Sequence, residues 1–227
     1  SRSNHVRQVR LSGTALTLVG PARCFAGEAE PELQRRILES AHGSAADILV
    51  VDIGRGASEL AVDTYLDADI SVTVTLPEPA AVEQTYAFLR TVLVRAFVEA
   101  PTPSAHVVRQ ILSSPKGEAM PTFRALFEYV ERSCPEEWEA VREARADFSP
   151  VLVMNRCQNR ADRDMLRGMT DGLLMRWGIE ANPLGTLDED EVAHQAARWR
   201  RPLLTTYPSS VIATGIERIG SQIMSLI

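Results

Sequence analysis

The sequence predicts an α/β fold, a mostly parallel β-sheet flanked by helices, with a helical insertion. Short apolar, β-branched runs that are typical of buried strands alternate with longer amphipathic segments that are typical of helices. This alternation favours right-handed βαβ units, which place successive strands in one parallel sheet. The length of 227 residues fits one large α/β domain, so we expect a single domain over 1–227.

In the first part of the chain, Leu11–Val19 has the β-branched content of a strand, and Gly20-Pro21 ends it. A helix is expected from Pro31, because proline is tolerated in a first helical turn. A buried apolar strand over 48–52 should follow. The next expected elements are a helix over 58–66, a strand over 70–74 and a long helix over 80–100.

The alternation stops at Pro101-Thr-Pro103, and the charged residues of 101–147 are expected to form a helical insertion. Its aromatic side chains are interpreted as core anchors, because acidic neighbours would repel the phosphates of a nucleic acid. The α/β pattern then resumes. Strands are expected over 149–154 and 181–187, and helices over 162–177, over 188–199 and from 208 onwards.

The segment Ile48-Leu-Val-Val-Asp-Ile-Gly-Arg-Gly56 places a carboxylate at the expected end of a buried strand. Parallel sheets bind ligands at the carboxyl ends of their strands, and the glycines allow a sharp turn and a close backbone approach. This is the layout of a Walker B strand, whose aspartate holds Mg²⁺ directly or through water. The alternative is an ordinary strand-to-loop junction, where Asp and Gly are also common.

Composition narrows the classes of function. A net charge of −6 and a pI of about 5.3 give no support for a nucleic-acid-binding surface. Cys24, Cys134 and Cys157 are widely spaced, which argues against a disulfide framework or a zinc ribbon and suits a cytoplasmic protein. No apolar run approaches the roughly 20 residues that cross a bilayer. The last helix carries one basic residue, Arg218, so we expect it to pack on the core and not on a membrane surface.

Several segments, taken in order, carry a resemblance to a known family. They are Asp52-Ile-Gly-Arg-Gly56, Ala68-Asp69, Val72-Thr-Val-Thr-Leu-Pro-Glu-Pro79, Val151-Leu-Val-Met-Asn-Arg156, Leu184-Gly185, Asp188-Glu-Asp190 and Arg201-Pro202-Leu203. Their order and spacing resemble the MinD/ParA-type ATPases, which are P-loop NTPases of the SIMIBI type with a deviant Walker A loop. The Pro-Glu-Pro segment and Tyr207-Pro-Ser are most similar to MinD-like flagellar-number regulators. The resemblance covers nearly the whole chain except 101–147.

The resemblance implies ATP and Mg²⁺ as cofactors of an intact member, and a cytoplasmic homodimer that forms when nucleotide is bound. It implies that Asp52 holds Mg²⁺, through water, and that Gly56 lets the switch loop sense the γ-phosphate. Asn155 and Arg156 would line the adenine pocket. An ordinary capped strand end is the alternative for Asn155. No nucleic acid is expected as a partner, and the sequence does not name a protein partner.

The departures from the family pattern limit the expected activity. The sequence has no Gly-rich loop with a lysine, and its only lysine, Lys116, lies in the insertion. Such a loop supplies the backbone N–H groups and the charge that hold phosphates, and Asp52 cannot replace it. Thr186-Leu187 also stands where the family usually has Ile-Pro.

Two hypotheses follow from these departures. The chain is the C-terminal part of a MinD/ParA-like ATPase that lacks its P-loop and does not hydrolyse ATP as it stands. Such a protein would act as a dimerising switch in cell organisation, of the flagellar-number, division-site or partitioning type. Alternatively, the chain is a P-loop-less relative that binds no cofactor and serves as a non-enzymatic scaffold or dimerisation partner.

Overall fold

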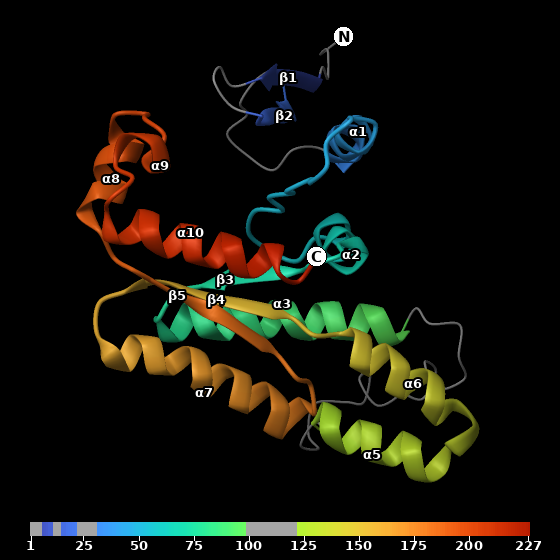
Figure 1. Cartoon of the computed structure of the whole chain (residues 1–227). Helices are drawn as coiled ribbons and strands as arrows, with labels where there is room; N and C mark the ends of the chain where they lie inside the picture. Colours follow the sequence, from blue (N-terminus) through green and yellow to red (C-terminus); the bar gives the residue numbers. More distant parts are fainter. Residues whose placement is uncertain (1–5, 11–14, 22–30, 99–121) are drawn as a thin grey trace. The chain divides into compact units, whose positions relative to one another are not determined.

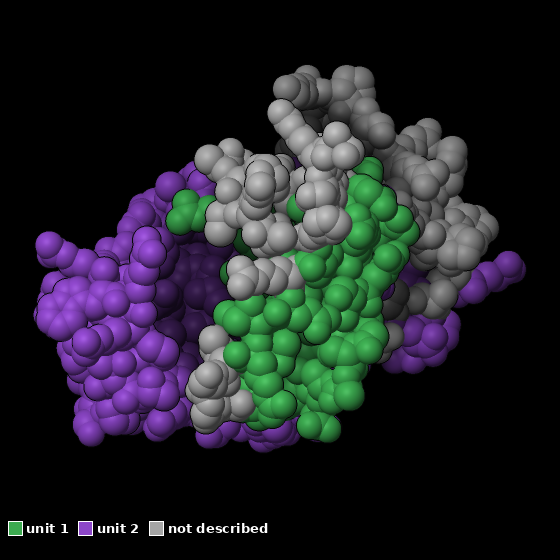
Figure 2. All heavy atoms as spheres, turned by 90° about the horizontal axis from the view of Figure 1, so that it is seen from above, with its two compact units in different colours: residues 1–64 green, residues 65–227 purple. Residues whose placement is uncertain are grey.

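The computed structural model describes residues 6–10, 15–21, 31–98 and 122–227. By its internal contacts the chain divides into two compact units, residues 1–64 and 65–227, which Figure 2 colours separately. The boundary falls within one helix, α2 (Glu59–Asp67).

The first unit contains a two-stranded ribbon and a helix. β1 (Val6–Arg10) pairs antiparallel with β2 (Thr17–Pro21), and α1 (Pro31–His42) contacts both strands. The Gln8 side-chain amide donates a hydrogen bond to the Ser40 hydroxyl at 3.1 Å, which ties the ribbon to the helix. The strand expected over 11–19 is therefore found in part, over 17–21, and residues 11–14 lie outside the described residues. It belongs to this ribbon and not to the parallel sheet, because its partner is β1, which sequence patterns did not predict.

The buried strand expected over 48–52 is not formed. The side chains of this run are exposed, at 50% for Ile48, 39% for Leu49, 86% for Val50 and 38% for Val51. The segment pairs with no strand in the part of the chain that the structure describes. An apolar run forms a buried strand only where neighbouring strands pair with its backbone and helices cover its faces. Asp52 therefore does not end a buried strand.

The second unit is built on a three-stranded parallel sheet in the order β3–β4–β5 (Figure 1). Its strands are β3 (Val72–Thr75), β4 (Val151–Cys157) and β5 (Asn182–Asp188). α3 (Pro79–Val98) follows β3, and α7 (Arg160–Trp177) connects β4 to β5; both helices lie on one face of the sheet. α10 (Val211–Met224) covers the other face along β5. The predicted α/β class, a parallel sheet flanked by helices, is confirmed at this level.

The core of this unit follows from strand alternation. Val151 and Val153 of β4 pack with residues of β5 and α10. Because successive strand residues point to opposite faces, Leu152 and Met154 face α3 and α7, where both are fully buried. Burying one such side chain contributes about 1.5–3 kcal/mol, so this four-residue run is a major source of stability.

The described part of the expected insertion is helical. It comprises α5 (Phe123–Ser133) and α6 (Pro135–Asp147), while residues 99–121 lie outside the described residues. The Phe127 ring lies 5.1 Å from that of Phe97 on α3, and the Phe123 ring lies 5.4 Å from that of Trp177 on α7, between ring centroids. Phe123 and Phe127 are buried and serve as core anchors, as the sequence predicted. Tyr129 was expected to be an anchor as well, but it is 50% exposed, and Trp138 is only half-buried.

Side-chain caps fix the helices that follow the strands. Asn159 and Asp162 form a reciprocal capping box at the start of α7, and Gly178 ends that helix with a φ of 67°. Asp190 caps α8 (Glu191–Arg198), and its second carboxylate oxygen accepts from the Ile212 N–H of α10 at 3.3 Å. A short helix, α9 (Leu203–Thr206), connects α8 to α10.

None of the helices in the described ranges is long and apolar enough to span a bilayer.

Candidate functional site

The carboxyl ends of the three parallel strands bring the candidate site together. β3 ends at Thr75, β4 at Cys157 and β5 at Asp188. Parallel α/β sheets bind ligands outside this edge. Asn155 and Arg156, the residues expected at the adenine, lie just before the last residue of β4, at this edge of the sheet. Their position is therefore the one that the sequence predicts.

A β-bulge distorts β4 at these two residues. Met154 pairs with Thr186 and Cys157 pairs with Asp188, so Asn155 and Arg156 together face the single residue Leu187. Arg156 has a φ of 60°, in the left-handed region that a non-glycine residue rarely adopts. Bulges are common beside binding sites because they redirect a side chain, and they are rare in parallel pairs. Strain of this kind persists only where the surrounding structure enforces it.

Glu189 holds the bulge through its side chain. The Arg156 guanidinium donates to one Glu189 carboxylate oxygen, from Nε at 3.0 Å and from Nη2 at 2.7 Å. The Gln158 amide donates to the other oxygen. The hydrogen bond from Arg156, then that from Gln158, lowers the pKa of Glu189, so this carboxylate is ionised at neutral pH. The His194 imidazole lies 3.9 Å from the same carboxylate.

A second ion pair lies beside the first. Arg163 of α7 donates to the Asp188 carboxylate from Nε at 2.9 Å and approaches it with Nη2 at 2.8 Å. Arg156 and Arg163 are thus each paired with an acid, Glu189 and Asp188 respectively, whereas Arg218 of α10 donates to the Thr186 carbonyl of β5 at 3.0 Å. Glu78 adds further negative charge, since its field contributes to raising the pKa of Arg156 after the larger effect of Glu189. The guanidinium groups of Arg156 and Arg163 are therefore engaged by carboxylates and would have to leave them to bind a phosphate.

Asn155 presents an oriented amide. Its Oδ1 accepts from the Arg156 backbone N–H at 2.9 Å. With the oxygen engaged, the two amide N–H donors are the groups left to face a ligand. Among the described residues no protein group is found to accept from them. A ligand with an acceptor in the plane of a ring would satisfy this donor pair.

Asp52 and Gly56 belong to the first unit, whereas Asn155 and Arg156 belong to the second. Asp52 is exposed, and its Oδ1 accepts from the Gly54 N–H at 2.9 Å, which closes an Asx-turn. Gly54 and Gly56 have φ values of 71° and 100°, so both use the conformational freedom of glycine. The expected turn after Asp52 is present.

The described residues fit one part of a Mg-ATP ligand and not the other. Donors and a planar guanidinium at the bulge suit a neutral aromatic base. The phosphates and Mg²⁺ lack partners, because the sequence has no Gly-rich loop with lysine and the described residues hold no cluster of three metal-ligating side chains. Burial raises the pKa of the Cys157 thiol, so this residue is no reactive nucleophile at neutral pH.

Sequence reasoning missed Glu189 and Gln158 as members of the site. A signal was present, since Asp188-Glu-Asp190 begins at the last residue of β5, and Asn155 and Arg156 lie near the end of the neighbouring β4. Residues after adjacent parallel strands meet at one edge. The ion pair between Arg156 and Glu189 could therefore have been predicted from the sequence.

In comparisons with known proteins, no protein-family model matches the chain and no curated protein matches it at a significant level.

Proposed function

We propose that this chain is the adenine-binding part of a MinD/ParA-like ATPase, a protein that acts as an ATP-dependent dimerising switch in cell organisation, of the flagellar-number, division-site or partitioning type. The observation that carries the proposal is the bulge at Asn155 and Arg156 on the carboxyl edge of a parallel sheet. The motif series supports the family, and the parallel α/β sheet is compatible with a P-loop NTPase fold.

The chemistry of the bulge supports a purine. An asparagine amide pairs well with adenine, whose ring nitrogens accept and whose exocyclic amine donates. The Asn155 N–H donors would take a ring nitrogen, because its oxygen is engaged by the backbone. Arg156 is half exposed, at 48% of its side chain, and a planar guanidinium stacks on an aromatic face.

The same residues do not support phosphate transfer. Arg156 and Arg163 are paired with carboxylates, and the phosphate-binding loop with its lysine is missing from the sequence. Asp52 would hold a Mg²⁺-bound water and Gly56 would serve the switch loop only in a protein that supplies the triphosphate cradle. We therefore propose no hydrolysis by this chain as it stands.

The proposal is tested by comparing nucleosides with nucleotides in calorimetric titrations. Adenosine, AMP and Mg-ATP should bind with affinities within about tenfold of one another, because the base supplies the contacts. Asn155→Ala should weaken adenosine binding by about 2- to 10-fold, since one neutral hydrogen bond contributes about 0.5–1.5 kcal/mol. Asn182→Ala, which removes an amide at the opposite edge of the sheet, is the matched control.

Three results would contradict the proposal: no adenosine binding at millimolar concentration, binding of Mg-ATP without adenosine, or equal affinity of the Asn155→Ala variant and the parent chain.

A second candidate function is a scaffold or dimerisation partner without nucleotide chemistry. Val74, in the middle of β3, is 59% exposed, and β3 has an unpaired outer edge among the described strands. Open edges with apolar side chains pair readily with other chains. Sedimentation analysis separates the two functions, because a scaffold should dimerise equally with and without adenosine or Mg-ATP.

A further inference from the structure

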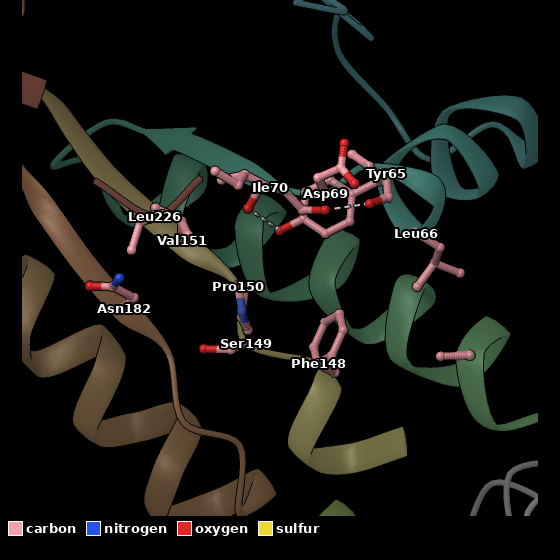
Figure 3. A pocket seen from close by; sticks show the side chains of 13 residues that line it. Tyr65, Leu66, Asp69, Ile70, Phe148, Ser149, Pro150, Val151, Asn182 and Leu226 are labelled. Carbon is pink, nitrogen blue, oxygen red and sulfur yellow. Dashed lines mark hydrogen bonds between the residues drawn. The ribbon is translucent and has the colours of Figure 1, made fainter. Parts of the chain in front are cut away.

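A cavity lies at the edge of the sheet opposite to the candidate adenine site. It has a volume of about 460 Å³ and is formed where the strands begin, with Val151 of β4 and Asn182 of β5 in its wall (Figure 3). The end of α2, the loop before β3, the loop before β4 and Leu226 near the C-terminus complete it. All its lining residues belong to the second unit. The volume falls within the range of small-molecule sites.

Three polar groups in this wall have no hydrogen-bond or ion-pair partner within the described residues. They are the Asp69 carboxylate, the Ser149 hydroxyl and the Asn182 side-chain amide. The Tyr65 hydroxyl, by contrast, is engaged with the Thr73 hydroxyl at 2.8 Å. The three groups are the ones available to a ligand.

The remaining wall is apolar or neutral. Ile70, Pro150, Val151 and Leu226 supply aliphatic surface, and Figure 3 shows them between Asp69 on one side and Asn182 on the other. Burial raises the pKa of Tyr65 to about 12, so its phenol stays neutral. Among the described residues that line the cavity, Asp69 is the only one with a charged side chain.

We propose that this cavity binds a small amphipathic amine: an ammonium group at Asp69, an apolar body along the aliphatic wall, and a hydroxyl or amide group at Ser149 and Asn182. A single carboxylate in a hollow whose other lining side chains are uncharged favours a cation over a neutral or anionic molecule of the same shape. Apolar walls supply affinity, and a few polar groups fix orientation, as in small-molecule sites generally.

The test uses three probes of matched shape in ¹⁵N-edited NMR titrations of the full chain. Tyramine carries the ammonium, 2-(4-hydroxyphenyl)ethanol is its neutral counterpart, and 3-(4-hydroxyphenyl)propionate is an anion. We expect saturable shifts at the amides of Asp69, Ile70 and Asn182, with affinity highest for tyramine and lowest for the anion. Added salt should weaken tyramine alone, since screening acts on the charged pair.

Two variants locate the binding. Asp69→Asn should weaken tyramine by about 2- to 5-fold, the range for an exposed ion pair, and leave the neutral probe unchanged. Asp67→Asn is the matched control, because this exposed carboxylate ends α2 outside the cavity wall. Ser149→Phe places a ring at an exposed wall position and should abolish binding of tyramine and the neutral probe.

The proposal is overturned if none of the probes binds below about 10 mM, an upper limit set by the affinity scale of weak ligands. It is equally overturned if the anion binds as well as tyramine, or if Asp69→Asn and Asp67→Asn have the same effect on tyramine.

Discussion

The left-handed backbone of Arg156 allows strain and side-chain interaction to be measured separately. Arg156→Ala removes the ion pair with Glu189 and keeps a side chain at a φ of 60°. Arg156→Gly removes the same ion pair and also relieves the backbone. Because the two variants share the lost contact, the difference between their free energies of unfolding reports the backbone strain minus the extra entropy of unfolded glycine.

The magnitudes follow from the local structure. The ion pair is solvent-exposed, so its loss costs little, and the loss is the same in both variants. A side chain in the left-handed region costs about 1–2 kcal/mol, from which the greater freedom of unfolded glycine subtracts about 0.5–1 kcal/mol. We expect Arg156→Gly to be about 1 kcal/mol more stable than Arg156→Ala, or roughly 2–4 °C in melting temperature.

Urea titrations followed by circular dichroism measure this difference. Arg200 supplies a matched control, because it has a φ of 52° just after α8 and no ion pair or side-chain hydrogen bond is found for it in the described structure. The free energy of unfolding of Arg200→Gly should exceed that of Arg200→Ala by a similar amount. An Arg156→Gly variant that is less stable than Arg156→Ala would refute the assignment of strain to the bulge.

Three further predictions concern the second unit. Gly172→Ala should be less stable than Gly168→Ala on the same helix by about 1–3 kcal/mol in thermal melts, because the methyl added at Gly172 would lie 2.7 Å from the Tyr86 hydroxyl, whereas Gly168 has open space around it. Asp190→Ala should cost about 1–2 kcal/mol in urea, since its carboxylate accepts backbone N–H groups from the first turns of two helices. The pKa of Glu189 is lowered in the folded chain, so ionised Glu189 stabilises the fold above the ordinary glutamate pKa of about 4.3. This stabilisation is lost as the pH falls through the lowered pKa. The difference in urea midpoint between the parent chain and Glu189→Gln should therefore be present at neutral pH and vanish in acid.

Two apolar runs of similar composition show how far local sequence determines structure here. Residues 151–154 form the centre of β4, with exposures of 0–5%, while residues 48–51 lie exposed outside any sheet. The first run has β3 and β5 as neighbours and helices over both faces. Strand formation depends on such distant partners, which composition does not encode. Helices were predicted more reliably because their signals are local, as with the capping box at Asn159.

The candidate site likewise has one feature that local sequence predicts and others that depend on distant parts of the chain. The location of Asn155 and Arg156 at the carboxyl edge follows from the apolar run that precedes them, which is a local pattern. The bulge does not follow from it, because it arises from the register of β4 on β5. The contact between Arg156 and Glu189, 33 positions apart, depends on that register too. Contacts that depend on strand pairing can be predicted only when the fold is known.

The two edges of the parallel sheet differ in the ligand chemistry they can serve. At the carboxyl edge Arg156 and Arg163 are held by acids, so a ligand gains from base contacts and little from charge. At the amino edge the single carboxylate Asp69 lies unpaired beside apolar surface, so a ligand gains from carrying a positive charge. Adenosine and tyramine should therefore bind independently, and Asn155→Ala and Asp69→Asn should each affect one of them. Mutual exclusion of the two ligands would place both at a single site and contradict this separation.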